Sequence, residues 1–252
     1  MMTTPLRRLL AVTAFTCILI GPMSRWVDAR AIETNTAVLT ASIPVDALTH
    51  LDLTALDGSV DLTASTDPAA SNITVSVSLA PPRTLNMRRP MAADISQVRI
   101  RQNTHQNVLQ LGLTNAAEGN IEAAWTIVVP ARFSARISGH DGEIHVAGLS
   151  GGVDADLNSG LGGRRGKMSV DVPQGKLKLT MGVGEIVASR ASDRFDRAEV
   201  ESSVGSAALF VLGHQIKAPH APGPGHRIAL GGDGDHVIVA KVAVGDVTVR
   251  IG

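Results

Sequence analysis

The chain has 252 residues, 25 glycines and one cysteine, and its 23 basic and 23 acidic side chains give a formal net charge of zero. Only 2% of the residues are aromatic, and none is a tyrosine. The balanced charge argues against a nucleic-acid-binding footprint and against a polybasic membrane patch. The scarcity of aromatic rings argues against surfaces that stack sugars or single-stranded nucleic acid.

Residues 1–31 have the three parts of a secretory signal peptide. Arg7 and Arg8 form a basic start, an apolar stretch runs from Leu9 to Ile20, and Ala29-Arg30-Ala31 matches the small-x-small cleavage pattern. The apolar stretch is shorter than the roughly 20 residues that a membrane-spanning helix needs. We predict cleavage after Ala31 and export to the periplasm or the cell exterior. A retained N-terminal anchor is the alternative.

The mature chain predicted by that cleavage has 221 residues and no cysteine, because Cys17 lies in the leader. Its 19 basic and 22 acidic residues leave it slightly acidic. No disulfide is then available, so β-ladder pairing and core burial must supply the stability. We predict a leader over 1–31, a linker over 32–45, an antiparallel β region over 46–137 and a glycine-rich region over 138–252, the last two forming one continuous domain.

Residues 46–137 contain three glycines and several runs of alternating apolar side chains, which are typical of half-buried strands. The clearest runs are Val60/Leu62/Ala64, Ile73/Val75/Val77/Leu79 and Ile121/Ala123/Trp125/Ile127/Val129. Asp57-Gly58 lies between two such runs and predicts a tight hairpin turn. Residues 80–93 are rich in proline and arginine and predict an exposed loop.

From Gly139 to Gly252 the chain holds 21 of its 25 glycines, and short alternating apolar runs follow the glycine clusters. Strands of about five residues with a glycine at each corner are typical of a coil of stacked rungs, because glycine adopts the left-handed conformations that a tight corner needs. Val-Gly recurs at Val183, Val204 and Val244, and these spacings of 21 and 40 residues fit a turn of roughly 20 residues, counted once and then twice.

These patterns predict an all-β fold in which the antiparallel β region leads into a glycine-cornered β-solenoid. Each rung of such a coil cannot bury its apolar face alone, so neighbouring rungs must stack. An irregular β-sandwich is the competing architecture, because short alternating strands with glycine turns are compatible with both.

Five short motifs occur between Trp125 and Val249: Trp125-Thr-Ile-Val-Val-Pro130, Ile137-Ser-Gly139, Gly142-Glu-Ile144, Gly148-Leu-Ser-Gly-Gly152 and Val244-Gly-Asp-Val-Thr-Val249. Together they resemble the putative adhesin family of bacterial envelope proteins, a domain of unknown function related to autotransporter-adhesin head domains. The resemblance covers residues 45–252 and implies a β-solenoid-like fold outside the cytoplasm. That family has no agreed catalytic residues, so the resemblance implies none here.

Two glycine-rich motifs resemble reactive loops but differ from them in detail. Gly148 to Gly152 matches the G-x-S-x-G elbow of hydrolases around Ser150, yet a glycine-bounded strand rather than a helix follows it. Gly160 to Lys167 lacks the first glycine of a phosphate-binding loop, and Met168 stands where that loop needs Ser or Thr. We assign no catalytic residue and no cofactor.

The candidates for metal ligation are Asp233, Asp235 and His236 in a glycine-rich turn, and His140 and His145 around a predicted strand. The first three come near the calcium-binding nonapeptide of β-rolls, but the motif occurs once, whereas such sites are built between tandem copies. On a strand, His145 points away from its apolar neighbours and towards solvent. We therefore predict a glycine-rich turn and solvent-facing histidines, with no bound metal.

Asp154 and Asp156 share one face of a predicted strand, a spacing compatible with a glycosidase pair, although solvated outward charges are the commoner outcome. Without a convincing catalytic set, we predict an exported, non-catalytic envelope protein. It acts as a structural or adhesin-like interaction module whose partner is an envelope protein or a surface polysaccharide. One alternative is a polysaccharide-acting enzyme on a β-solenoid scaffold, in which Asp141, Glu143, Glu185 and this pair converge in one groove. The other is an accessory or sensor subunit of an envelope complex.

Overall fold

The computed structural model describes residues 30–32, 36–55, 57–81, 95–116, 121–158, 165–217, 224–234 and 236–252. Most of the predicted leader, most of the predicted loop over 80–93, the segment 159–164 and Asp235 lie outside these residues. The described residues form one sheet of 18 strands and a short 3-10 helix, η1 (Ile95–Gln97), so the all-β prediction is confirmed. None of their helical turns is long and apolar enough to cross a membrane.

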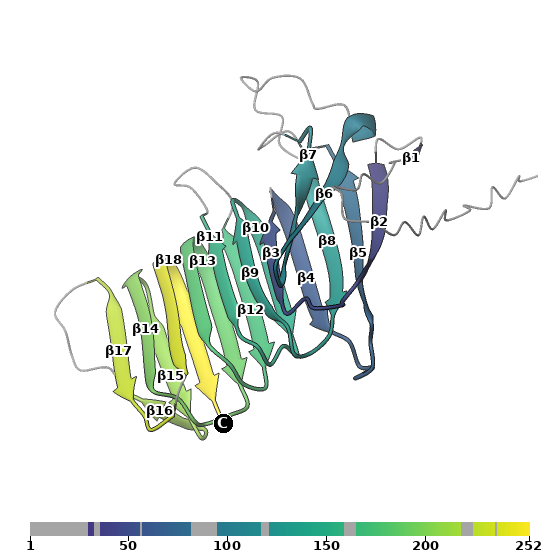
Figure 1. The fold of residues 1–252 in the computed structure, drawn as a ribbon. Coiled ribbons are helices and arrows are strands. Elements are labelled where there is room, and N and C mark those ends of the chain that lie inside the picture. Colours follow the sequence, from purple (N-terminus) through teal and green to yellow (C-terminus); the bar gives the residue numbers. More distant parts are fainter. Residues whose placement is uncertain are drawn as a thin grey trace, which may run out of the picture.

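Most strands are short, and two near the C-terminal end are long (Figure 1). In chain order they are β1 (Arg30–Ile32), β2 (Thr36–Pro44), β3 (His50–Thr54), β4 (Gly58–Ala64), β5 (Asn72–Ala80), β6 (Arg99–His105), β7 (Val108–Thr114), β8 (Glu122–Val129), β9 (Ser134–Gly139), β10 (Gly142–Ala147), β11 (Val153–Leu157), β12 (Gly166–Val172), β13 (Leu177–Arg190), β14 (Arg197–Val204), β15 (Ala207–Val211), β16 (His214–Ile216), β17 (His226–Gly231) and β18 (Val237–Ile251). The long strands β13 and β18 have 14 and 15 residues, enough to pass through two neighbouring parts of the sheet.

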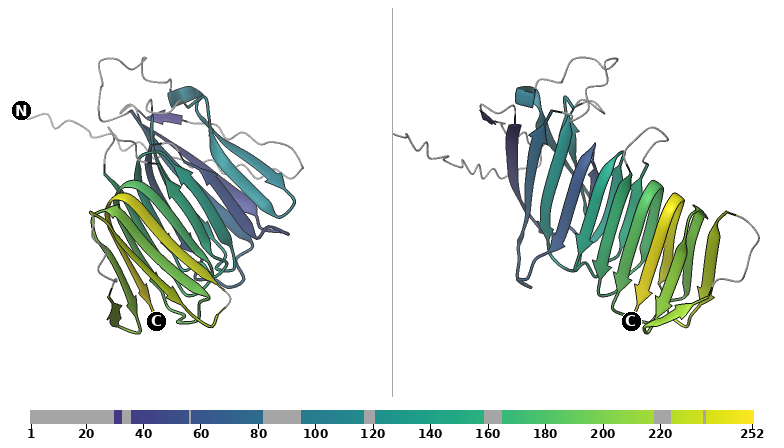
Figure 2. Two further views of the ribbon diagram at one scale, coloured as in Figure 1. Left: turned by 90° about the vertical axis from the view of Figure 1, so that its left-hand side faces the viewer. Right: turned by 180° about the vertical axis from the view of Figure 1, so that it is seen from behind.

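Parallel pairing arranges the strands in two runs. Run A has the order β7, β3, β9, β11, β13, β18, β14 and uses the first half of β13 and of β18. Run B has the order β8, β4, β10, β12, β13, β18, β15 and uses their second halves. Because β13 and β18 belong to both runs, the sheet is continuous and curls into a nearly closed, barrel-like form (Figure 2).

Antiparallel strands extend both runs at their ends. β6 pairs with β7 at one end of run A, and β5, β2 and β1 continue run B beyond β8. At the other end β17 pairs with β14, and β16 pairs with β15. The sheet is therefore mixed. The region 46–137, predicted to be antiparallel, also contains β3 and β4, which pair in parallel with strands on both of their sides.

The core lies between the runs and is built by the alternation that the sequence shows. Ile73, Val75, Val77 and Leu79 of β5 are fully buried, and they belong to one apolar cluster that includes side chains from both runs. Trp125 is its largest member. Full burial of one valine, leucine or isoleucine side chain stabilises the fold by about 1.5–3 kcal/mol. The face of each strand that carries these side chains at every second position therefore turns inward.

The turn at Asp57-Gly58 is not the predicted hairpin. It joins β3 to β4, but β3 pairs with β7 and β9, whereas β4 pairs with β8 and β10. The chain therefore passes from run A to run B at this point instead of reversing beside itself. A short Asp-Gly turn between two alternating runs suits both geometries, which is why the local pattern was misleading.

Glycines at the corner between the runs stack in register across the strands. Gly142 pairs with Gly58, Gly166 with Gly184, and Gly184 with Gly245. A methyl group at Gly184 would lie 2.0 Å from the carbonyl oxygen of Gly166, and one at Gly245 would lie 1.8 Å from that of Gly184. Both residues also have positive φ angles, 148° and 137°. Close backbone approach and left-handed conformation thus both require glycine here.

The three Val-Gly pairs stack in an order that differs from the sequence. Val183 and Val204 both pair with Val244, because β18 lies between β13 and β14. The interpretation of the 40-residue spacing as two turns is therefore wrong, since Val204 and Val244 are direct neighbours. The last strand of the chain is inserted into the sheet, where earlier strands cover both of its sides.

Candidate interaction surfaces

The outward side chains of run A carry charges that alternate from strand to strand. Strand register places Asp52 of β3, Arg136 of β9, Asp154 of β11 and Lys178 of β13 in one row. The Lys178 Nζ atom lies 3.4 Å from Asp154 Oδ2, and both side chains are well exposed. Exposed pairs of this kind contribute about 0–1 kcal/mol, so the row gives the surface a charge pattern more than it stabilises the fold.

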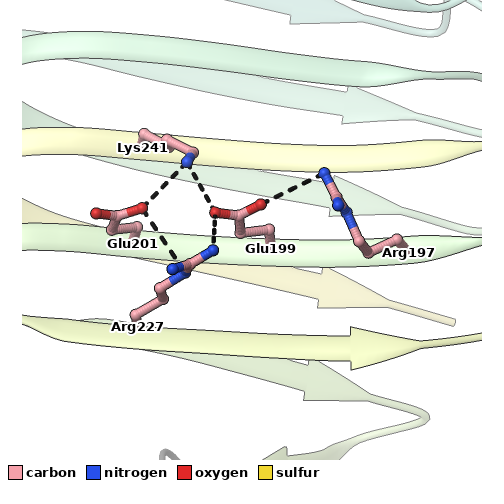
Figure 3. Close-up of polar contacts among 5 residues, drawn as sticks. All are labelled: Arg197, Glu199, Glu201, Arg227 and Lys241. Carbon is pink, nitrogen blue, oxygen red and sulfur yellow. Dashed lines mark hydrogen bonds and ion pairs between the residues drawn. The ribbon is translucent and has the colours of Figure 1, made fainter. Parts of the chain in front are cut away.

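The densest charged group, the Glu199 cluster, joins β14, β17 and β18 (Figure 3). It consists of Arg197, Glu199, Glu201, Arg227 and Lys241. Lys241 Nζ donates hydrogen bonds to Glu199 Oε1 at 2.7 Å and to Glu201 Oε2 at 3.1 Å. Arg227 Nη2 lies 3.0 Å from Glu199 Oε1, and Arg197 Nη2 lies 3.5 Å from Glu199 Oε2. The cluster therefore cross-links three adjacent strands through side chains.

The Glu199 carboxylate is shielded by the cations around it, and its side chain is only 6% exposed. The hydrogen bond from Lys241 holds the pKa of Glu199 below its ordinary value, against the opposing effect of burial, and Arg227 and Arg197 lower it further. The same hydrogen bond, with the one to Glu201, raises the pKa of Lys241. Both groups are therefore charged at neutral pH, and the cluster is an ionised network.

The outward face of run B is different at its N-terminal end, where small hydroxyl side chains dominate. One row contains Thr40 of β2, Ser76 of β5, Thr126 of β8 and Asp61 of β4. The strands alternate, so Ser42, Ser59, Thr63, Thr74 and Ser78 also face outward on this side, and Val38, Ala124 and Val128 lie among them. We call this surface the hydroxyl face. It is polar, like the charged face of run A, but nearly free of charge.

A cavity of about 430 Å³ lies where the turn after β12, the end of β13 and the turn before β18 meet. It is lined by Gln174, Arg190, Ser192, Arg194, Asp233, Gly234 and His236. Arg190 is only 2% exposed, and its guanidinium donates hydrogen bonds to the carbonyl oxygens of Gly175 and Ser192. These bonds fix the orientation of a buried cation in the wall of the cavity.

Asp233 and His236, two of the residues considered as metal ligands, line this cavity, and Asp235 lies outside the described residues. Their turn is bound to the segment before β14. Gly234 N donates to Phe195 O at 2.8 Å, and Asp196 N donates to His236 O at 2.9 Å. A methyl group at Gly232 would lie 2.1 Å from the Phe195 carbonyl oxygen. Close packing of two backbones thus explains Gly232 and Gly234 of the segment that resembled a calcium-binding motif.

The other candidate residues are dispersed over the sheet. His140 lies in the turn between β9 and β10, and His145 is exposed on β10, where register places it between Asp61 and Ser169. Across the described residues, no three His, Cys, Asp or Glu side chains are grouped so that they could hold a metal ion. Ser150 donates its hydroxyl to Ala131 O at 2.9 Å, a contact typical of a structural turn.

The five carboxylates that an enzyme on this scaffold would bring together are divided between the runs. Asp154 and Asp156 belong to β11 in run A, whereas Glu143 and Glu185 belong to run B. Asp141 lies in the turn before β10. Because the two pairs lie on outward faces of different runs, they do not line a common groove.

The sequence interpretation missed the two most distinctive polar sites, Arg190 and the Glu199 cluster. A signal for Arg190 was present, since it is in phase with the inward residues Ile186 and Ala188 of the same strand. Glu199 gave a weaker signal, because its importance depends on Lys241, which is distant in sequence and reaches it only through the pairing of β14 with β18.

No family model and no curated protein matches the chain. Its fold is similar to the solved structure of a putative cell adhesion protein from Clostridium sporogenes, with a TM-score of 0.50 and 11% identity over 86% of this chain and 100% of that one. A putative adhesin from Parabacteroides merdae gives a TM-score of 0.25 and 12% identity over 85% of this chain and 96% of the other. One from Parabacteroides distasonis gives 0.28 and 10%, over 85% and 97%. The similarity to the Clostridium sporogenes structure confirms, for the fold, the resemblance to adhesins inferred from the sequence.

Proposed function

We propose that the protein is an exported, non-catalytic module that mediates contacts in the bacterial envelope, in the manner of an adhesin. The observation that carries the proposal is the long sheet with two outward faces of contrasting chemistry, one alternately charged and one rich in hydroxyls. A fold similar to that of a cell adhesion protein supports it. The partner is an envelope protein or a surface polysaccharide.

The proposal includes export through a leader that is cleaved after Ala31, to the periplasm or the cell exterior. Sequencing the N-terminus of the chain recovered from the envelope fraction tests this step, and we expect the mature chain to begin at Ile32. Replacing Ala29 and Ala31 with tyrosine should block cleavage, because signal peptidase needs small residues at these positions. A chain that is recovered with its leader intact would refute the cleavage but not the adhesin-like role.

The proposal also includes the β-solenoid architecture, with runs A and B as faces of one coil. Its support is the regular spacing of neighbouring strands: 18 residues separate β9 from β11 and β12 from β13, and 24 separate β10 from β12 and β11 from β13. From β9 to β13 the chain alternates between the runs, which is how a coil advances. An irregular sandwich remains the alternative, and an experimental structure of the mature chain decides between them.

The binding role is tested by affinity capture on the protein's own envelope fraction. We expect the mature chain to be retained, and a change of charge on the outward face that binds the partner to remove retention. Arg136→Glu with Lys178→Glu changes the face of run A, and Ser76→Lys with Thr126→Lys changes the hydroxyl face. Each double variant is the matched control for the other. Turnover of a glycan, ester or peptide that is abolished by one polar substitution would contradict the non-catalytic role.

A second candidate function, that of a ligand-sensing accessory subunit, is favoured by the Arg190 cavity. Its volume of about 430 Å³ is large enough for a small molecule, and its lining is mainly polar. A screen of small metabolites by thermal shift tests it, with Arg194→Ala as a variant in the exposed part of the wall. A ligand that stabilises the wild-type chain but not this variant would favour the sensor role over the adhesin role.

A further inference from the structure

The strands at the ends of the sheet differ in how well they are protected against pairing with another chain. β6, at one end of run A, carries Arg99, Arg101 and His105. β17, at the other end, carries His226 and Arg227 and ends in a glycine, and β16 has only three residues. Charged side chains and short length are the usual means by which proteins prevent edge strands from pairing.

β2 has none of these protections. It is nine residues long, and from Thr36 to Ile43 it contains no charged residue, no glycine and no proline. β5 covers one side of it from Ala37 to Pro44, and β1 covers the other side only from Thr36 to Val38. In the part of the chain that the structure describes, Leu39 to Pro44 therefore have no strand partner on the outer side (Figures 1 and 2).

The strand that partly covers β2 coincides with the predicted cleavage site. Arg30 pairs with Val38, Ala31 with Ala37, and Ile32 with Thr36. Cleavage after Ala31 would remove two of the three paired residues, and a single remaining pair cannot hold a strand in place. Among the described residues, the outer side of β2 from Ala37 to Pro44 would then have no paired strand, and η1 would still contact β2.

We propose that β2 is a self-association edge: after removal of the leader, two copies of the chain pair their β2 strands antiparallel about a two-fold axis. The proposal rests on the cleavage step of the proposed function. A two-fold pair of this kind places each residue opposite its counterpart or a near neighbour. Val38, Thr40 and Ser42 carry no charge, so such pairing costs no repulsion.

The occupant is a second copy because β2 is self-complementary under this symmetry. Two-fold pairing about Thr40 places Thr40 opposite its own counterpart and Val38 opposite Ser42, and all three residues are uncharged and exposed. A pair centred on Thr40 would use Ala37 to Ile43 of each copy, including Ala37 and Val38, which β1 occupies in the uncleaved chain. It would join the two hydroxyl faces into one surface twice as long, which suits a module that binds a repetitive partner.

Sedimentation equilibrium of the chain beginning at Ile32 tests the proposal. We expect a concentration-dependent dimer, and about tenfold or greater weakening of the dimer in Thr40→Lys and in Thr40→Glu, because like charges then face each other. An equimolar mixture of the two variants should form the heterodimer, which also shows that both are folded. Thr126→Lys is the control, since Thr126 is exposed on the same face but lies on the internal strand β8.

The proposal is overturned by a mature chain that stays monomeric, by a dimer that Thr40→Lys leaves intact, or by variants that do not associate when mixed. Sequencing of the exported chain separates this result from the proposed function. If the native N-terminus is Ile32 and the chain is monomeric, the self-association edge fails and export stands. If the native N-terminus lies elsewhere, cleavage after Ala31 fails, and with it the proposal that leader removal opens the edge.

Discussion

The two ends of the sheet differ in how their edges are protected against pairing with another chain. At the C-terminal end, β18 is inserted between β13 and β14, antiparallel strands cover both runs, and the Glu199 cluster cross-links the strands. At the N-terminal end, β2 is uncharged and only partly covered. The C-terminal end is protected against edge-to-edge pairing, whereas the uncharged strand β2 at the N-terminal end is able to pair. The contrast predicts that edge-to-edge pairing with a second copy forms at the N-terminal end only.

Disrupting the glycine corner of β18 should cause the largest loss of stability at the C-terminal end of the sheet. In Gly245→Ala, the added methyl group would lie 1.8 Å from the Gly184 carbonyl oxygen, and the residue would keep an unfavourable positive φ. We expect a loss of about 3 kcal/mol or more in the free energy of unfolding, measured by urea denaturation. Gly231→Ala is the control, because a methyl group there meets open space. Equal losses of unfolding free energy in both variants would contradict the importance of the stacked corner glycines.

Neutralising the centre of the Glu199 cluster should weaken the same end to a smaller degree. Glu199→Gln keeps the shape of the side chain but leaves Lys241 and Arg227 without their shared carboxylate. We expect a loss of about 1–3 kcal/mol in unfolding free energy. Asp154→Asn, which removes the exposed pair with Lys178, should cost no more than about 1 kcal/mol. A ranking in the reverse order would show that the cluster does not stabilise the C-terminal end of the sheet.

The pH dependence of stability should report the same cluster. The pKa of Glu199 is lowered from its ordinary value of 4.5, so its contribution is present above that value and is lost as the pH falls through the lowered pKa. The pKa of Lys241 is raised from 10.5, so its contribution is present below that value and is lost as the pH rises through the raised pKa. The unfolding free energies of wild type and Glu199→Gln, measured by urea denaturation between neutral and acidic pH, should converge at the acidic end. Parallel curves would rule out the assigned coupling.

Removing the Ser150 hydroxyl should lower the stability by less than neutralising Glu199 does. Ser150→Ala loses one hydrogen bond to Ala131 O, which corresponds to about 0.5–1.5 kcal/mol in unfolding free energy. Binding to the envelope fraction should be unchanged, because this turn is not part of the outward face of either run. A complete loss of a measurable turnover in Ser150→Ala would instead support the hydrolase-like interpretation of its motif.

Local pattern was enough to predict strands, core faces and corner glycines. The alternation over Ile73 to Leu79 determines which side of β5 is buried, and the recurring Val-Gly pairs marked Gly184 as a corner residue. The alternation depends on residues close in sequence, whereas the need for glycine at position 184 also depends on its contact with Gly166 of the neighbouring strand.

The order of the strands could not be predicted in the same way. That β18 lies between β13 and β14 depends on pairing between segments 40 and 61 residues apart, which no local period encodes. The Asp57-Gly58 turn illustrates the limit, because the same dipeptide suits a hairpin and a passage between runs. The Glu199 cluster follows from the strand order, so it was beyond reach for the same reason.

The most direct test of the contrast between the two ends is amide hydrogen exchange of the mature chain at low and high concentration. The account predicts that Leu39 to Ile43 of β2 gain protection at high concentration, while His226 to Gly231 of β17 exchange at the same rate throughout. Protection that rises at β17, or that rises at neither strand, would contradict it.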